Sequence, residues 1–354
     1  MNTEHDKIFP VKMPSSTQGQ RQAMASAEAA GLAQLGPCPS HLHETWLDIP
    51  LPNNQTNRTR LVWPKSSAAP QAPLQCPLVI YYHGGGLSSG SPDSVLAPAR
   101  AFAALFSCVV ACPALNQLPE LGFPAPVRNA WAVVAWLSDV ANLNEDVLNG
   151  TGVTVDPARG FIVGGLSSGG ATAAVIGAIS GLGADAAKVP EFEGITPLRS
   201  TITGIFSGIP FLATEAMLPA EYRDLFTSRV ENSEATADAL RLELESAMGV
   251  HSPWFSPLNF DVGTVQRLQS HPPKVFIYGG KLDPFRDDSV VYAKWLERFK
   301  GIEVRLTVLE GEGHNAWVTP PFPASHTRQI KEPTVDGMAW LLGVDWDRGM
   351  ELPF

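Results

Sequence analysis

Positive charge is scarce in this chain. Its 354 residues carry 25 Lys and Arg against 35 Asp and Glu, which gives a formal net charge of −10. No window gathers the basic side chains that a protein needs to neutralise a phosphate backbone or to lie on an anionic membrane surface. We therefore expect no nucleic-acid partner and no attachment to such a membrane.

Long hydrophobic runs are missing as well. Gly, Pro or charged residues interrupt every apolar stretch well before the roughly 18 residues that a spanning helix needs. The N-terminal residues include Glu4, Asp6, Lys7 and Lys12, so they lack the apolar centre of a secretory signal. These absences predict a chain without a membrane span, located in the cytoplasm.

Cysteine is rare too, and the four residues are Cys38, Cys76, Cys108 and Cys112. None of them has the C-x-x-C or Cys/His spacing of a metal site, so we expect reduced, buried thiols and no metal. Hydrophobic residues make up 44% of the chain and charged residues 17%. This balance favours a packed globular enzyme over a disordered or fibrous chain.

Strand-like and helix-like segments alternate along most of the chain. Short runs typical of strands lie at 43–51, 58–63, 78–82, 108–112, 161–163, 201–206, 274–278 and 303–309. Helical patterns lie at 97–106, 127–143, 171–179, 287–299 and 327–342. This alternation predicts an α/β fold with a mostly parallel twisted sheet and helices on both faces.

Two segments fall outside the alternation. Residues 1–42 are rich in Pro, Ser, Gln and Ala, and we expect an N-terminal arm with a helix from about residue 20 to residue 35. Residues 208–262 are too long for a simple crossover and have helical character at 220–226 and 235–248. We expect an inserted helical cap there. The remaining residues, 43–207 and 263–354, form the predicted core.

A nucleophile pattern follows the strand at 161–163. Gly165-Leu166-Ser167-Ser168-Gly169 is a G-x-S-x-G pentapeptide that leads into an Ala-rich helix. Flanking glycines let a strained strand-to-helix turn present the serine hydroxyl. The frame selects Ser167, because a frame centred on Ser168 loses one flanking glycine. Taken alone, the pattern also fits an ordinary glycine-rich turn.

A second glycine-rich motif, His83-Gly84-Gly85-Gly86, follows the buried strand at 78–82. Glycines at such a position can turn backbone N–H groups toward a developing oxyanion. We expect Gly84 and Gly85 to provide two donors of an oxyanion hole and the Ser168 N–H to provide a third.

The acid and the base must follow the nucleophile in the order Ser, Asp or Glu, His in this arrangement. Asp283 follows the strand at 274–278, and His314 follows the next strand in a glycine-rich loop. All three residues therefore follow the carboxyl ends of strands, where open α/β sheets place their sites. Asp287 and Asp288 remain alternatives for the acid.

With these motifs, the sequence resembles the hormone-sensitive-lipase-like family of α/β-hydrolases, also called the fold-3 esterases. The resemblance runs from about residue 78 to the C-terminus and includes Asp283-Pro284-Phe285-Arg286-Asp287. It implies a cofactor-free carboxylic ester hydrolase acting on a small ester, with a cap to which the N-terminal arm contributes. The family usually has Asp before the nucleophile, Ala after it, and Arg where Asn116 aligns; here Leu166 and Ser168 flank Ser167.

The expected reaction is two-step acyl transfer, with Ser167 as nucleophile, His314 as general base and Asp283 orienting the imidazole. Leu87, Met217 and Trp254 are candidates for an apolar substrate pocket, although such residues equally pack a cap onto a core.

Three alternatives remain open: an amide or formamide hydrolase, a tailoring hydrolase for an ester or lactone of a specialised metabolite, and a non-catalytic ligand receptor on the same fold. The complete triad argues against a receptor. The oligomeric state does not follow from the sequence.

Overall fold

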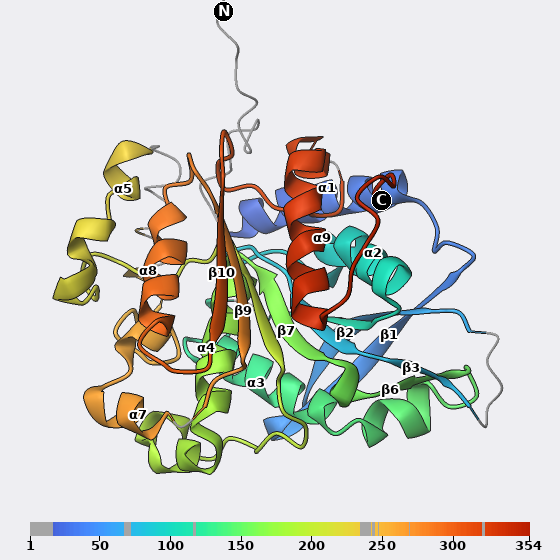
Figure 1. Ribbon diagram of the computed structural model, residues 1–354, viewed down its shortest axis with the longest axis horizontal. Coiled ribbons are helices and arrows are strands. Elements are labelled where there is room, and N and C mark those ends of the chain that lie inside the picture. The colour runs from blue at the N-terminus through green and yellow to red at the C-terminus, as the bar shows by residue number, and fades with distance from the viewer. Residues whose placement is uncertain are drawn as a thin grey trace, which may run out of the picture.

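The computed structural model describes residues 17–66, 72–115, 118–233, 242, 245–246, 248–268, 270–320 and 323–354. An eight-stranded sheet crosses the molecule in the order β1-β2-β5-β4-β7-β8-β9-β10 (Figure 1). β2 pairs antiparallel with β1 and β5, and all other neighbours are parallel. The strands are β1 (Leu42–Leu51), β2 (Gln55–Pro64), β4 (Leu78–Tyr82), β5 (Val109–Pro113), β7 (Phe161–Leu166), β8 (Gly204–Gly208), β9 (Lys274–Gly280) and β10 (Glu303–Leu309). The predicted α/β fold is confirmed.

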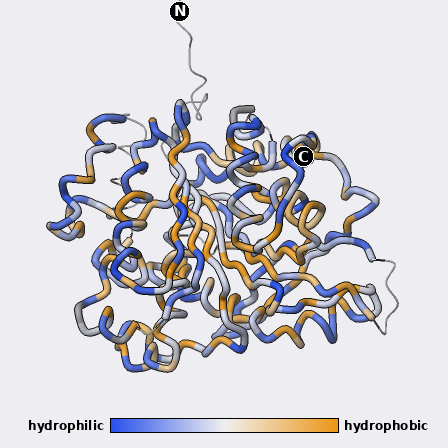
Figure 2. Tube along the Cα trace, in the orientation of Figure 1, coloured by the Kyte–Doolittle hydropathy of each residue, from blue (hydrophilic) through white to orange (hydrophobic). Residues whose placement is uncertain are grey.

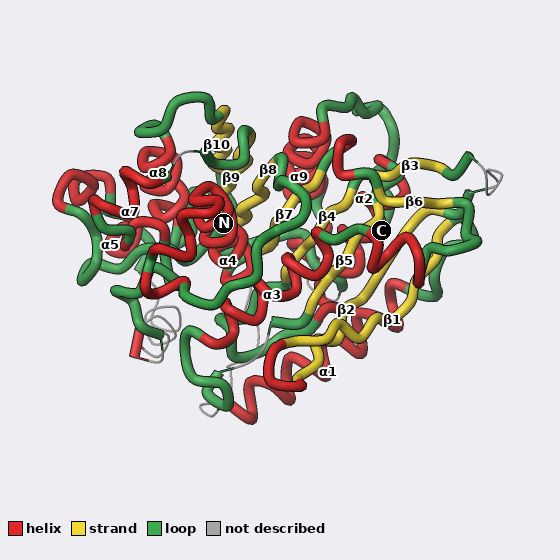
Figure 3. Tube along the Cα trace, turned by 90° about the horizontal axis from the view of Figure 1, so that it is seen from below, coloured by secondary structure: helices red, strands yellow, loops and turns green. Residues whose placement is uncertain are grey.

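Side chains along each strand alternate between two hydrophobic cores, one on each face of the sheet. In β4, Ile80 and Tyr82 belong to one core and Val79 and Tyr81 to the other. Helices α3 (Ala125–Ser138), α4 (Ser168–Leu182) and α8 (Arg286–Leu296) contribute to the first core, and α2 (Leu96–Phe106) and α9 (Arg328–Leu342) to the second (Figure 3). Figure 2 shows hydrophobic residues concentrated along the central strands.

The structure differs from the predicted elements in two places. The helix expected at 127–143 ends at Ser138, and a π-helical turn follows at Asn142–Val147. A small parallel pair, β3 (Leu74–Cys76) with β6 (Val153–Val155), occupies segments that carry no strand prediction. Three-residue strands are too short to show a recognisable alternation.

One helical stretch of the described residues, Ser168–Lys188, is long and apolar enough to cross a membrane. Within its most apolar window, 72% of the residues are buried inside the fold. A helix that packs in a core between a sheet and its neighbours needs the same composition, so length and hydropathy alone carry no further conclusion.

The two segments predicted to lie outside the core contain helical elements. The helix α1 (Thr17–Leu35) lies where the N-terminal arm is expected to be helical. The insertion contains a 3₁₀ helix at Ala220–Leu225, the short α5 (Ser228–Glu231), a 3₁₀ turn at Pro257–Asn259 and, at its end, α7 (Val262–Arg267). The helix expected at 235–248 falls largely outside the described residues, and so does Asn116.

Leu166 lies at the end of β7, directly before the predicted nucleophile, and its surroundings are apolar. It is 2% exposed and packs in the same core as Phe206 and Tyr278. Leu166→Asp places an unpartnered carboxylate there, so we expect a loss of several kcal/mol in the free energy of unfolding. Leu306→Asp, at a site on β10 that is 38% exposed, is the control and should cost less than about 1 kcal/mol. If urea unfolding gave equal losses of unfolding free energy for the two variants, position 166 would not be the apolar, buried site that we describe.

Candidate active site

Ser167 sits at the sharp turn between β7 and α4, with a φ of 54° and a ψ of −119°. Such a backbone is strained for a residue with a side chain, and it lifts the serine hydroxyl off the end of the strand. A Cβ on Gly165 would lie 2.6 Å from the Tyr82 carbonyl oxygen, and one on Gly169 would lie 2.5 Å from the carbonyl oxygens of Tyr82 and His83. Both glycines of the pentapeptide are therefore required by the close approach of the end of β4.

The structure brings Ser167, His314 and Asp283 together from three separate loops. His314 Nε2 lies 3.0 Å from Ser167 Oγ, and His314 Nδ1 lies 2.8 Å from Asp283 Oδ2. The buried carboxylate can only accept, so Nδ1 carries the proton and donates it to Asp283. Nε2 is then free to accept from the Ser167 hydroxyl. This is the arrangement in which an imidazole can act as a general base.

The acid is held in place by its own loop. Asp283 has no exposed surface, and its second oxygen, Oδ1, accepts the Phe285 N–H at 2.7 Å. The loops after β9 and β10 touch at Gly280, where a Cβ would lie 2.0 Å from the Gly313 carbonyl oxygen. The Leu282 N–H also donates to the Glu312 carbonyl at 2.7 Å. These backbone contacts fix the loop of the acid against the loop of the base.

The two alternative acids have other partners. Asp287 Oδ2 accepts the N–H groups of Thr227 and Ser228, both at 2.6 Å. Asp288 Oδ1 accepts from Leu212 and Ala213 at 2.7 and 2.8 Å, and its Oδ2 pairs with Arg229 at 2.8 Å. Both carboxylates thus tie the insertion to the start of α8, which leaves Asp283 as the acid that reaches the histidine.

The pKa values of Asp287 and Asp288 shift in opposite directions, although both carboxyl groups are buried. Burial raises the pKa of Asp288 to about 6, although Arg229 and the two backbone N–H groups favour its charged form. For Asp287, burial also acts to raise the pKa, but hydrogen bonds from Arg286, Ser228 and Thr227 outweigh it and lower the pKa overall.

Gly84, Gly85 and Ser168 are the three predicted oxyanion donors. A Cβ on Gly84 would lie 3.2 Å from Ser167 Cβ, so its backbone borders the serine directly. Within the described part of the chain, no protein acceptor is seen for the N–H of Gly84 or Gly85. Ser168 begins α4, and N–H groups in the first turn of a helix have no partner within it. The N–H groups of Gly84, Gly85 and Ser168 thus stay the predicted oxyanion donors.

His83 sets the orientation of this motif, a role that the sequence did not indicate. Its Nε2 accepts the Leu115 N–H at 3.0 Å, so the proton sits on Nδ1 and is donated to the Gly84 carbonyl at 2.7 Å. Burial lowers the pKa of His83 to about 4, which keeps the ring neutral. The carbonyl and the N–H of one planar peptide point in opposite directions. Holding the Gly84 carbonyl therefore turns the Gly85 N–H the other way.

The three predicted substrate-binding residues are all buried in one hydrophobic core. Leu87, with a φ of 59°, and Met217 are buried in the core that includes α3 and α4. Trp254 packs edge-on against Phe192 with 5.0 Å between ring centroids, and its Nε1 donates to the Glu191 carbonyl at 2.8 Å. No described contact joins Trp254 to the triad, so its indole is engaged within the fold.

The aromatic ring beside the base is Phe285. It packs edge-on against His314 at 5.2 Å between centroids, and Phe211 lies 5.1 Å from Phe285 on the other side. Phe255 in turn contacts Phe211 at 5.5 Å. The sequence contained a usable signal here, because Phe285 stands two residues after Asp283. An apolar aromatic wall thus borders the imidazole.

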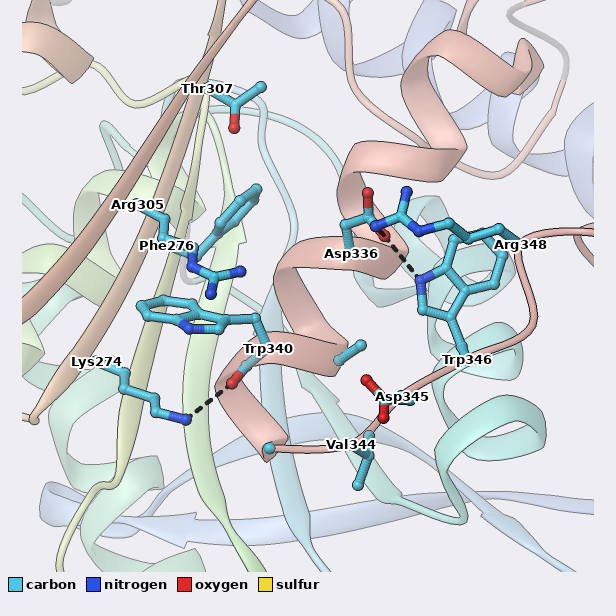
Figure 4. A pocket seen from close by; sticks show the side chains of 12 residues that line it. Lys274, Phe276, Arg305, Thr307, Asp336, Trp340, Val344, Asp345, Trp346 and Arg348 are labelled. Atoms are coloured by element: carbon cyan, nitrogen blue, oxygen red, sulfur yellow. Dashed lines mark hydrogen bonds and ion pairs between the residues drawn. The ribbon is translucent and has the colours of Figure 1, made fainter.

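A groove of about 420 Å³ lies far from the triad, at the other ends of β9 and β10 (Figure 4). Arg305 lies over one part of the Trp340 ring at 4.4 Å, and Lys274 Nζ lies 5.4 Å from the same ring and donates to the Trp340 carbonyl. Lys274 begins β9, whereas Asp283 follows its end. The groove is therefore separate from the catalytic edge. Within the described residues, no three Cys, His, Asp or Glu side chains gather into a possible metal site.

Comparison with known proteins places these residues in a familiar context. Residues 79–318 match the family described as alpha/beta hydrolase fold. An AB hydrolase superfamily protein of Schizosaccharomyces pombe is 28% identical over 94% of this chain and 91% of its own length. The carboxylesterase NlhH of Mycobacterium tuberculosis is 28% identical over 74% of this chain and 72% of its own length.

Solved structures have the same fold. Vibralactone cyclase superposes with a TM-score of 0.73 at 21% identity, covering 94% of this chain and 92% of its own. An esterase of Pyrobaculum calidifontis superposes with a TM-score of 0.69 at 21% identity, covering 94% of each chain.

The buried histidines predict how stability depends on pH. Burial lowers the pKa of His83 and of His271 from 6.5 to about 4. As the pH falls below 6.5, the unfolded chain binds protons that the folded chain does not accept until about pH 4. The free energy of unfolding should therefore be highest above pH 6.5. It should fall between pH 6.5 and about pH 4, by roughly 3 kcal/mol for each histidine.

Urea unfolding at pH 7, 5.5 and 4.5 measures this dependence. His271→Asn removes one of the two groups without touching the predicted site, so its stability should fall less steeply with acid than that of the wild type. Parallel pH profiles for the two proteins would contradict the prediction.

Proposed function

Because the chain belongs to the alpha/beta hydrolase fold family, in its hormone-sensitive-lipase-like group, we propose that it cleaves carboxylic esters through a covalent acyl-enzyme on Ser167. The family match and the esterase relatives make it a carboxylic ester hydrolase. The observation that supports this mechanism is the hydrogen-bonded series from Ser167 Oγ through His314 to Asp283, with distances of 3.0 and 2.8 Å.

In the first half-reaction, Ser167 Oγ attacks the ester carbonyl while His314 Nε2 takes the hydroxyl proton. Asp283 stabilises the resulting imidazolium and keeps its ring in place. The carbonyl oxygen becomes an oxyanion, which accepts from the N–H groups of Gly84, Gly85 and Ser168. Each such donor contributes about 10²–10³ to the rate in comparable sites. The tetrahedral intermediate then collapses, the ester C–O bond breaks, and His314 gives its proton to the alcohol.

In the second half-reaction, His314 Nε2 takes a proton from water, and the hydroxide attacks the acyl carbon through the same oxyanion hole. Collapse breaks the bond to Ser167 Oγ, which regains the proton from His314. The products are a carboxylic acid and an alcohol. These steps need only the residues named and water.

The insertion at 208–262 is proposed as a cap that forms the substrate pocket together with the N-terminal arm, residues 1–42. Phe211 and Phe285 support this placement, because they form an apolar wall next to His314. Met217 is buried in the same core as Phe211. An apolar pocket favours esters whose acyl or alcohol part is hydrocarbon.

The identity of the nucleophile is tested with a fluorophosphonate probe. We expect one covalent adduct per chain, located by mass spectrometry on Ser167 and abolished in Ser167→Ala. Ser168→Ala keeps its backbone N–H and should still be labelled. An adduct on Ser168, or an unlabelled wild-type protein, would overturn the proposal; the second result would favour a ligand receptor on the same fold.

The role of the cap is tested by acyl-chain preference. Met217→Ala enlarges the proposed pocket, so activity on p-nitrophenyl esters should shift toward longer acyl chains. Met338→Ala is the matched control, because Met338 is fully buried on the opposite face of the sheet. It should lose stability but keep the wild-type chain-length profile. An unchanged profile for Met217→Ala would count against the cap assignment.

A tailoring hydrolase acting on an ester or lactone is the second candidate. It is favoured by the likeness to the versiconal hemiacetal acetate esterase of Dothistroma septosporum, 23% identical over 75% of this chain. The chemistry is shared, because a lactone carbonyl accepts the same attack by Ser167. Rates on matched linear esters, lactones and formamides separate this candidate and the amide alternative from a general esterase.

A further inference from the structure

We propose that the N-terminal helix α1 is a positioning element of the active site, in which Arg21 and Glu28 hold the oxyanion loop in its catalytic shape. The oxyanion loop is defined here as residues 83–91, from His83 to Ser91. The inference rests on the proposed function, because it concerns how Gly84 and Gly85 are kept ready to stabilise the oxyanion.

Arg21 bonds directly to the backbone of this loop. Its Nε donates to the Ser88 carbonyl at 2.7 Å, and its Nη2 donates to the Leu118 carbonyl at 2.5 Å. Ser88 belongs to the turn that starts at Gly85, since the N–H groups of Ser88 and Ser89 both donate to the Gly85 carbonyl at 3.0 Å. One guanidinium therefore restrains the segment that carries a proposed oxyanion donor.

Leu118 connects the same guanidinium to the loop a second time. The Leu118 N–H donates to the Leu87 carbonyl at 2.6 Å, while the Leu118 carbonyl accepts from Arg21. Arg21 also forms a surface pair with Glu120, at 2.6 and 2.8 Å. An Arg fork suits this task because its donors point in fixed, divergent directions from one plane.

Glu28 holds the far end of the loop. Its carboxylate accepts the Ser91 N–H at 2.9 Å and the Ser91 hydroxyl at 2.9 Å. Arg21 and Glu28 are seven residues apart, so they lie on one face of α1, about 10 Å apart along the axis. The helix thus bonds to the C-terminal half of the loop at two points, Ser88 and Ser91.

The oxyanion loop needs such external support because its backbone is strained at Leu87. Gly85, Gly86, Leu87 and Gly90 all have positive φ, at 112°, 63°, 59° and 85°. Left-handed conformations are costly for a residue such as Leu87 and persist only where the surroundings impose them. Within the described elements, α1 packs mainly on the turn at Pro92–Val95. It is built largely of Ala and Gln, so its polar bonds carry much of the docking.

The consequence is specific to the transition state. When Arg21 or Glu28 is removed, the loop relaxes and the donors lose their alignment with the oxyanion, while the pocket still binds the ester. We expect kcat to fall at least tenfold for Arg21→Ala and for Glu28→Ala, with KM within about twofold of the wild type. Both variants keep the hydrogen bonds of His83, which still hold the Gly84–Gly85 peptide in part, so activity is reduced and not abolished.

The experiment measures kcat and KM on a p-nitrophenyl ester and the inhibition constant of a trifluoromethyl ketone, whose adduct carries an oxyanion. Concentrations are taken from fluorophosphonate titration, so that only competent sites are counted. The inhibition constant should rise in parallel with the loss in kcat/KM. Arg21→Lys retains the charge without the fork and should lie between the wild type and Arg21→Ala.

Two controls separate positioning from stability. Arg328→Ala removes an exposed arginine that likewise bonds a glutamate side chain, Glu332 at 2.8 Å, and a backbone carbonyl, that of Arg348, but has no described bond to the oxyanion loop. It should keep wild-type kinetics. Glu120→Gln removes only the charge of an exposed pair and should change kcat less than twofold.

Wild-type kcat and inhibitor affinity in both Arg21→Ala and Glu28→Ala would overturn the inference, as would a loss confined to melting temperature. Failure of the proposed function gives a different result, because the wild-type protein itself would then take up no fluorophosphonate and cleave no ester.

Discussion

The close approach of two backbones beside Ser167 is the constraint on which the site depends. Gly165 and Gly169 lie against the carbonyls of Tyr82 and His83 with no room for a Cβ. This contact joins the end of β4 to the turn after β7, and it places Gly84 against Ser167 in the same step. The nucleophile and its proposed oxyanion donors are thus set relative to one another by backbone packing. Long side chains, which have more rotamers, are not needed to set that distance.

Much of this core could be predicted from the sequence, because its signals are local. Runs such as Leu78–Tyr82 are apolar throughout, as strands buried on both faces must be. Parallel strands bring their carboxyl ends to one edge, so the order of Ser167, Asp283 and His314 already implied that they would meet. The sequence favoured Asp283 as the acid but left Asp287 and Asp288, which are close in the chain, as alternatives. The structure separates the three by their partners: only the Asp283 carboxylate bonds to His314, whereas those of Asp287 and Asp288 bond to residues of the insertion.

The supports of the site were not predictable, since they join residues far apart in the chain through backbone atoms. Arg21 reaches Ser88, and Ser228 Oγ donates to the Pro284 carbonyl at 2.8 Å. Any backbone carbonyl can accept such a bond, whatever its side chain. The residue type at the accepting position therefore does not predict the bond. For the same reason the role of His83 emerged only from its neighbours. Two loops of the proposed site are therefore each contacted by a segment distant in the chain: the oxyanion loop by α1, and the loop of Asp283 by residues of the segment 208–262.

A buried charge pair secures the second of these contacts. Arg229 and Asp288 have almost no exposed side-chain surface, and the Arg229 guanidinium lies 4.4 Å from the Phe285 ring that packs on His314. A hydrophobic pair of similar volume often stabilises a fold as well as a buried ion pair does. Here, however, Arg229 also donates to the carbonyls of Pro284 and Ala213, and Asp288 accepts two backbone N–H groups. Apolar replacements would fill the space but leave the Ala213 carbonyl and the N–H groups of Leu212 and Ala213 without these partners, at a cost of about 1–3 kcal/mol for each that stays buried. The Pro284 carbonyl would keep its bond from Ser228 Oγ. The charges are thus matched to the backbone groups that fix the insertion against the loop of the acid.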